Sequence, residues 1–180
     1  MKLLYPVSFF FIAIATTTLI CDSAFAQRSV GSLGQMPCAA NGGYFAAINE
    51  DIVINRRVYT AVGQISNSDW DRNGYIDRGQ PVEVTCKLAG RNSSPIHKTL
   101  TMTVGLDDKP YYWYNSFGSR VKLSVYLDGN FAGSTEVGYK EVNRFSISLE
   151  NKRSVALVAE CVSSARTCPS LKILEDKLIK

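Results

Sequence analysis

Four stretches of the sequence alternate apolar and polar residues with a period of two. They read VEVTC at 82–86, LTMTV at 100–104, VKLSV at 121–125 and FSISL at 145–149. Successive side chains of a β-strand point to opposite faces of the sheet, so this period indicates strands with one buried and one solvated face. One-sided burial is common in antiparallel sheets. The sequence therefore predicts an all-β fold of antiparallel strands.

Turn-forming residues divide this pattern into hairpins. One predicted hairpin joins 121–127 to 131–137 through Asp128-Gly129-Asn130, and another joins 145–150 to 154–162 through Asn151-Lys152. Asp-Gly between two apolar stretches is a strong short-range signal for a hairpin. Residues 155–158 are continuously apolar, which is typical of a strand covered on both faces.

Two segments are open to more than one interpretation. Residues 44–54 predict a strand, because β-branched residues are frequent there. The same residues allow a helix, since Phe45, Ile48 and Ile52 would lie near one helical face. Residues 171–180 predict either a last strand or a short helix. Together the segments amount to about seven or eight short strands with polar turns, which is typical of a β-sandwich.

The segment VEVTCKL at 82–88 resembles the B strand of an immunoglobulin domain. Such domains also place a Trp some way after that Cys and a Tyr two residues before the second Cys. In this chain the next Trp is Trp113, and Ala159 stands two residues before Cys161. We therefore expect a single antiparallel β-sandwich over residues 44–180, immunoglobulin-like in character but outside that family.

The N-terminus predicts a cleaved export signal. Lys2 precedes a mostly apolar stretch at 3–20, and Ala24-Phe25-Ala26 supplies the small residues that a signal peptidase accepts. A membrane anchor is the alternative, which Pro6 and the cleavage site oppose. We expect residues 1–26 to be removed by bacterial-type export to the periplasm or the medium, leaving no membrane span. The Gly-rich residues 27–43 predict a tail or loop ahead of the sandwich.

Four cysteines remain after this cleavage: Cys38, Cys86, Cys161 and Cys168. An even number in an exported chain indicates two disulfides, and the spacings do not suit a zinc site. We favour Cys38–Cys86 with Cys161–Cys168, because the short gap in the second pair closes easily across a turn. The alternative pairs Cys86 with Cys161 and Cys38 with Cys168.

Residues 69–80 read DWDRNGYIDRGQ and resemble the calcium loop of EF-hand and dockerin proteins. Calcium takes roughly six to eight oxygen ligands, and alternate residues of a tight loop converge on one point. The resemblance implies a calcium cofactor with these ligands: Asp69, Asp71, Asn73, the Tyr75 carbonyl, Asp77 and Gln80. It also places Gly74 at a sharp turn and points the side chain of Ile76 inward.

One position departs from the calcium-loop pattern. The last ligand is normally a bidentate Glu, and here it is Gln80, so one charge and one contact are lost. Arg72 and Arg78 add positive charge nearby. We therefore expect weak calcium binding with a structural role. The alternative is an ordinary Asp/Asn/Gly turn.

Aromatic residues crowd the segment YYWYNSF at 111–117. Exposed aromatic side chains on a loop suit stacking on sugars or contact with a protein partner. We therefore expect Tyr112, Trp113 and Tyr114 to bind the ligand. The alternative is that these rings fill the core.

Charge and histidine content narrow the class of function. The net charge of +4 is scattered, whereas nucleic-acid binding needs a concentrated positive face. The single histidine, His97, argues against His-based triads and multi-histidine metal sites, and we expect it on the surface. We interpret the chain as an exported, non-catalytic module that binds carbohydrate or protein. The alternatives are a structural or adhesive subunit of a surface fibre, and a small secreted inhibitor or toxin-subunit-like protein.

Overall fold

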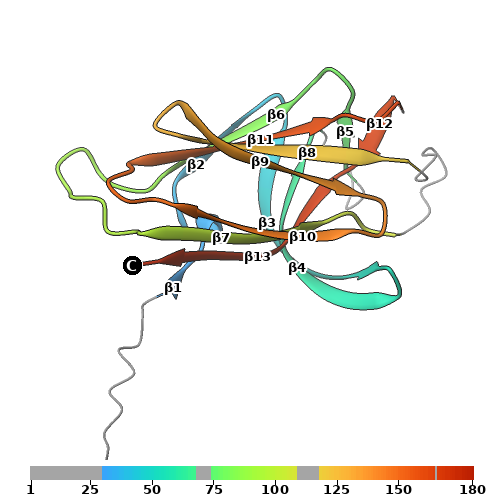
Figure 1. Ribbon diagram of the computed structural model, residues 1–180, viewed down its shortest axis with the longest axis horizontal. Coiled ribbons are helices and arrows are strands. Elements are labelled where there is room, and N and C mark those ends of the chain that lie inside the picture. The colour runs from blue at the N-terminus through green and yellow to red at the C-terminus, as the bar shows by residue number, and fades with distance from the viewer. Residues whose placement is uncertain (1–29, 68–73, 109–117, 165) are drawn as a thin grey trace, which may run out of the picture.

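Two antiparallel β-sheets pack face to face in the computed structural model, which describes residues 30–67, 74–108, 118–164 and 166–180 (Figure 1). Within these residues the first sheet has the order β10-β7-β13-β4-β3, with β1 paired to β13. Its strands are β1 (Val30–Gly31), β3 (Tyr44–Ile54), β4 (Arg57–Ser66), β7 (Thr99–Gly105), β10 (Val142–Ser148) and β13 (Leu171–Ile179). This arrangement confirms the predicted all-β sandwich.

The second sheet has the order β2-β6-β11-β8-β9. Its strands are β2 (Cys38–Asn41), β6 (Val82–Lys87), β8 (Arg120–Leu127), β9 (Asn130–Gly138) and β11 (Ser154–Cys161). A small third sheet pairs β5 (Tyr75–Asp77) with β12 (Thr167–Pro169). Figure 1 shows the second sheet as the upper layer and β7, β10 and β13 of the first sheet as the lower layer.

The alternating segments lie as their period predicts. In β6 the side chains of Val82, Val84 and Cys86 are fully buried, and the residues between them are exposed. The buried residues of β7, β8 and β11 join them in one core between the two sheets. In β11 the outward-facing Ala156 and Val158 are only half-buried, so its apolar run is not covered on both faces. β11 lies between β6 and β8 in its sheet. Only one of its faces packs against the core, and the outer face stays open.

Both ambiguous segments are strands. Residues 44–54 form β3, which pairs with β4 from Tyr44 to Ile54, and residues 171–179 form β13. The alternative helix over residues 44–54 is therefore not formed. The β3–β4 hairpin turns at Asn55 and Arg56, whose φ angles are 51° and 65°. Positive φ at both central residues is typical of the tight turns that match strand twist.

Of the two predicted hairpins, one is confirmed and one is wrong. Asp128 and Gly129 have φ angles of 49° and 81° and join β8 to β9. The residues around Asn151 instead carry the chain from β10, which pairs with β7, to β11, which pairs with β6 and β8. They therefore connect the two sheets. Periodicity shows which face of a strand is buried, but it does not show which strand lies beside it.

Residues 30–41 form part of the sandwich, whereas the sequence predicted a tail or loop. Leu33 is fully buried in the core, within the short 3₁₀ helix η1 (Leu33–Gln35). The Ser32 hydroxyl donates to the Asp176 carboxylate at 2.8 Å, and the Gly34 N–H donates to it at 3.2 Å. These bonds fasten η1 to β13, so the sandwich includes this segment as well as residues after 44.

A second, smaller core lies beneath the β3–β4 hairpin. It contains the buried Ile52, Ile54 and Ala61, with Val142 and Leu174 packed against them. The hairpin projects at the lower right of Figure 1, away from the interface between the sheets. The residue that lets its tip pack on β7 is Gly105, where a Cβ would lie 2.5 Å from Ile54 Cδ1.

Candidate functional site

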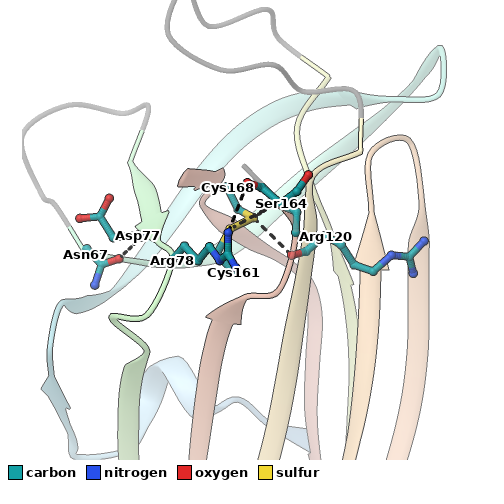
Figure 2. Close-up of a disulfide and its surroundings, with 8 residues drawn as sticks. Asn67, Asp77, Arg78, Arg120, Cys161, Ser164 and Cys168 are labelled. Carbon is teal, nitrogen blue, oxygen red and sulfur yellow. Dashed lines mark hydrogen bonds between the residues drawn. A yellow bond between two sulfur atoms is a disulfide. The ribbon is translucent and has the colours of Figure 1, made fainter. Parts of the chain in front are cut away.

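Asn67 holds together the two ends of the loop that contains the predicted calcium ligands. Its N–H donates to the Tyr75 carbonyl at 2.7 Å, and its Oδ1 accepts from the Asp77 N–H at 2.6 Å (Figure 2). Its Nδ2 donates to the carbonyls of Gly42 at 2.6 Å and Gln80 at 3.1 Å. One side chain thus ties β4, β5 and the start of β6 into a common loop base.

The third sheet supports this loop base from the other side. β5 pairs with β12 so that Ile76 lies opposite Cys168. The Ser170 N–H donates to the Gly74 carbonyl at 2.9 Å, beyond the end of β12. The Cys161–Cys168 disulfide joins β12 to β11, as Figure 2 shows, so the second sheet anchors β12. The loop base is therefore bonded to both large sheets.

Three of the predicted calcium ligands lie at this base. The Tyr75 carbonyl already accepts the Asn67 N–H, Asp77 is half-buried and Gln80 is exposed. The other three, Asp69, Asp71 and Asn73, lie outside the described residues. In the described ranges no group of three or more His, Cys, Asp or Glu side chains could hold a metal ion. Calcium binding therefore stays a prediction.

Gly74 and Ile76 fit tightly into the fold. Ile76 is fully buried in the main core. A Cβ at Gly74 would overlap the Ser66 hydroxyl and would lie 2.8 Å from Gln64 Nε2. Close approach to β4 thus requires glycine at this position, whereas the calcium-loop pattern placed a glycine here for a sharp turn.

A charged side chain, that of Lys172, is buried on β13 and bonds Gln64, the residue that also lies beside Gly74. Lys172 is only 1% exposed, and its Nζ lies 3.3 Å from Glu50 Oε2 and bonds Gln64 Oε1. Gln64 in turn donates to the Tyr44 hydroxyl at 2.8 Å. A buried ammonium needs such partners because desolvation is costly. Sequence patterning missed this network, since Lys172 stands in an otherwise ordinary strand.

Both predicted disulfides are confirmed. Cys38 and Cys86 lie directly opposite each other on β2 and β6, with Cα atoms 4.1 Å apart. Cys161 and Cys168 have Cα atoms 5.5 Å apart and close the connection from β11 to β12. The alternative pairing across the sheets is thereby excluded.

The predicted ligand-binding aromatics, Tyr112, Trp113 and Tyr114, lie outside the described residues. An aromatic pair that the sequence analysis missed lies on the β8–β9 hairpin. Tyr126 and Phe131 meet edge to face with ring centroids 5.7 Å apart, and Phe131 is 61% exposed. Their positions on either side of the Asp128-Gly129 turn could have indicated the pair, because residues near a tight turn lie opposite each other.

His97 is buried, so the expectation that it lies on the surface is wrong. The residue is 5% exposed and lies just before β7, and β1 approaches it at Gly31. Desolvation by burial, with a smaller effect of the Lys180 charge, lowers the pKa of His97. The imidazole is therefore neutral at physiological pH. Pairing of β1 with β13, which no local pattern indicated, covers this residue.

Comparison with known proteins gives matches at the level of structure. No protein-family model matches the sequence, and no curated protein matches it either. One similar solved structure is the CBM51 module of a Clostridium perfringens GH95 protein in complex with methyl-galactose. The two chains share 12% identity over 83% of this chain and 99% of that one, with a TM-score of 0.56.

Two longer structures also match. One contains the CBM51-2 domain of Clostridium perfringens ZmpB in complex with GlcNAc, at 15% identity and a TM-score of 0.61 over 84% of this chain. The other contains the tandem CBM51 modules of a family 98 glycoside hydrolase from Streptococcus pneumoniae, at 12% identity and a TM-score of 0.61. The present chain spans 32% and 47% of their lengths. It shares the β-sandwich fold of these modules.

Proposed function

We propose that the protein is an exported, non-catalytic carbohydrate-binding module. The observation that carries this proposal is the match to an isolated CBM51 module over 99% of that module's length. That module is in complex with methyl-galactose, and the ZmpB domain is in complex with GlcNAc. A shared fold does not transfer a ligand, so the proposal names only the class of ligand, a sugar.

The binding residues we propose are Tyr112, Trp113 and Tyr114. Aromatic rings present a flat apolar face that suits the C–H face of a sugar ring. Asp108 lies between the end of β7 and the aromatic segment at 111–117. Its carboxylate accepts the Asn55 N–H at 2.7 Å, so the chain that leads into the aromatic segment is anchored. A rigid attachment favours binding because less motion is lost when the ligand is held.

A glycan array followed by calorimetry on the mature chain tests the proposal. Trp113→Ala should weaken binding of the sugars that the wild type retains more than it lowers the melting temperature. Phe131→Ala is the matched control, because it removes an exposed ring opposite Tyr126, toward the end of β8 that is far from residue 118. An empty array for the wild type, or a Trp113→Ala variant that binds normally, would contradict the proposal.

Calcium has a structural role in this proposal. The predicted ligands would lock residues 69–80 against the strand that starts after Pro81. The hydrogen bonds of Asn67 support this idea, because they fix both ends of the loop before any ion binds.

Export is proposed from the signal sequence, with cleavage after Ala26 and a mature chain that starts at Gln27. Intact-mass analysis of the secreted protein checks the cleavage site. Across the described residues, no helix is long and apolar enough to cross a membrane. The fibre-subunit alternative would need an N-terminal arm that pairs with a neighbouring molecule. Here Val30 and Gly31 already pair with β13 of the same chain, which favours the binding module.

A further inference from the structure

A small pocket lies between the tip of the β3–β4 hairpin and the turn that joins β9 to β10. Its volume is about 210 Å³, and it is lined by Ile54, Asn55, Arg57, Tyr59, Lys140 and Val142. Pockets for drug-sized ligands are larger, roughly 300–1,000 Å³, so this one suits a single small ring. Figure 1 shows the hairpin tip and the start of β10 at the same end of the first sheet.

The hairpin wall of the pocket is anchored at its tip. The Asp108 N–H donates to the Val53 carbonyl at 2.8 Å, and the Asn55 N–H donates to Asp108 Oδ2 at 2.7 Å. Ile54, just before the tip, is 1% exposed and packs over Gly105 of β7. The wall is therefore held by both hydrogen bonds and apolar packing, and a ligand would meet a formed site.

The floor of the pocket belongs to the second core. Ile54 is a buried member of that cluster, and Tyr59 and Val142 pack against it. Tyr59 is half-buried, so its ring both packs on the core and borders the pocket. An aromatic ring beside aliphatic side chains suits the apolar face of a sugar.

Two cations border this floor without a carboxylate partner. The Arg57 side chain makes no hydrogen bond or ion pair in the described part of the chain, and Lys140 Nζ lies over the Tyr139 ring, 5.0 Å from its centroid. Two acids of the neighbouring segments have partners of their own: Asp108 Oδ2 accepts the Asn55 N–H, and Glu141 lies 3.6 Å from Arg120. The charge of Arg57 and Lys140 is thus available to a ligand.

Two charged residues beside the pocket have left-handed backbone conformations. Lys140 has a φ of 63°, and Arg56 at the hairpin tip has a φ of 65°. Glycine or asparagine adopts this left-handed conformation more readily than a long side chain does. Strain of this kind is often retained at functional sites.

We propose that this pocket binds an oxyanion, a carboxylate or a sulfate, carried by a sugar ring. The inference rests on the proposed carbohydrate-binding function and names its ligand class as acidic sugars. Arg57 and Lys140 would pair with the oxyanion through charge-assisted hydrogen bonds. Tyr59 would stack on the ring, and the turn at Asn55 would add polar contacts at the rim.

The test uses the mature protein and three probes in NMR titration: galactose, galacturonic acid and galactose 6-sulfate. The wild type should bind at least one acidic probe about tenfold more tightly than galactose, since one charge-assisted hydrogen bond is worth about that factor. The acidic probe that binds more tightly shows whether the pocket prefers a carboxylate or a sulfate. Added salt should weaken this preference.

Arg57→Gln and Lys140→Gln should each remove most of the preference for the acidic probes over galactose, because each removes one charge-assisted hydrogen bond. Arg91→Gln is the matched control, because Arg91 is exposed in the connection before β7, whereas the pocket lies past the other end of that strand. Inorganic sulfate should bind less tightly than galactose 6-sulfate if the ring contributes.

The outcomes separate this inference from the proposed function. Galactose binding without an acidic preference would overturn the inference and leave the proposed function in place. An acidic preference that survives both Gln variants would also overturn it, because the charge would then act elsewhere. A chain that binds none of the three probes and no glycan on the array would contradict both.

Discussion

Ile54 occupies the space above Gly105 that any other residue at position 105 would fill. A Cβ built on Gly105 lies 2.5 Å from Ile54 Cδ1, in a cluster where Ile54 is 1% exposed. Since a buried methyl group has little room to move, Gly105→Ala should lower the free energy of unfolding by about 1–3 kcal/mol. Urea denaturation measures this loss.

The matched variant is Ile54→Val, which removes Cδ1. Alone it should cost about 0.5–1.5 kcal/mol. The double variant should cost much less than the sum of the two single variants, because a Cβ at position 105 no longer overlaps Cδ1. Additive free energies in the double-mutant cycle would show that the two residues do not interact in this way.

The two disulfides should differ in their contribution to stability. Cys38–Cys86 spans 48 residues and Cys161–Cys168 spans 7. By loop-closure entropy, paired Cys→Ala replacements should cost about 4 kcal/mol for the first bridge and about 2.5 kcal/mol for the second. Guanidinium denaturation of the two variants gives the order. A larger loss for the short bridge would mean that its anchoring of β12 outweighs chain entropy.

Asn67→Ala should loosen the loop base. The variant loses the side-chain bonds to Asp77, Gly42 and Gln80, and leaves the partly buried Asp77 N–H without its acceptor. We expect a loss of about 1–3 kcal/mol and faster hydrogen exchange at the Asp77 amide. Asn130→Ala is the control, because Asn130 donates a single exposed bond to Asp128. Equal effects of the two variants would argue against a special role of Asn67.

Calcium should raise the melting temperature modestly and magnesium little. With Gln80 in place of a bidentate Glu, we expect a Kd of order 10⁻⁴–10⁻³ M. At ten times the Kd the gain is about 1.4 kcal/mol. Asp71→Ala should remove the response and Gln80→Glu should enlarge it. A Gln80→Glu variant with an unchanged response would show that position 80 is not a ligand.

Asp128 should contribute to stability at neutral pH and lose this contribution in acid. Partial burial raises its pKa, but the N–H groups of Arg153 and Ser154, the Ser154 hydroxyl and the Lys152 charge outweigh it, so the pKa of Asp128 lies below its ordinary value. A lowered folded-state pKa stabilises the protein above the unfolded-state pKa, and the effect fades as pH falls through the folded-state pKa.

Asp128→Asn tests this pH dependence, because Asn keeps an acceptor and tolerates the φ of 49°. The variant should be less stable than the wild type at neutral pH. The two unfolding curves should converge as the pH falls below about 4, the ordinary range of an aspartate. A constant difference between the curves down to strong acid would show that the charge of Asp128 is not responsible.

Much of the fold could be predicted from local patterns. The alternation at Val82, Val84 and Cys86 determined a strand and its buried face, since side-chain direction depends only on position along the strand. Asp128 and Gly129 determined a hairpin, because their backbone preferences are local. The count of cysteines determined two bridges, and the short spacing from Cys161 to Cys168 favoured the pairing that the structure has.

Long-range pairing was decided only by the tertiary structure. The pattern around Asn151 does not reveal that β10 and β11 belong to different sheets, because the partner of β10 (β7) and the partners of β11 (β6 and β8) are distant in sequence. The burial of Lys172 and His97 depends likewise on strands that approach from elsewhere in the chain. The pocket brings together Arg57 and Lys140, which lie more than eighty positions apart in the sequence. A sequence specifies which face each strand buries, whereas the neighbours of that strand follow from packing the whole core at once.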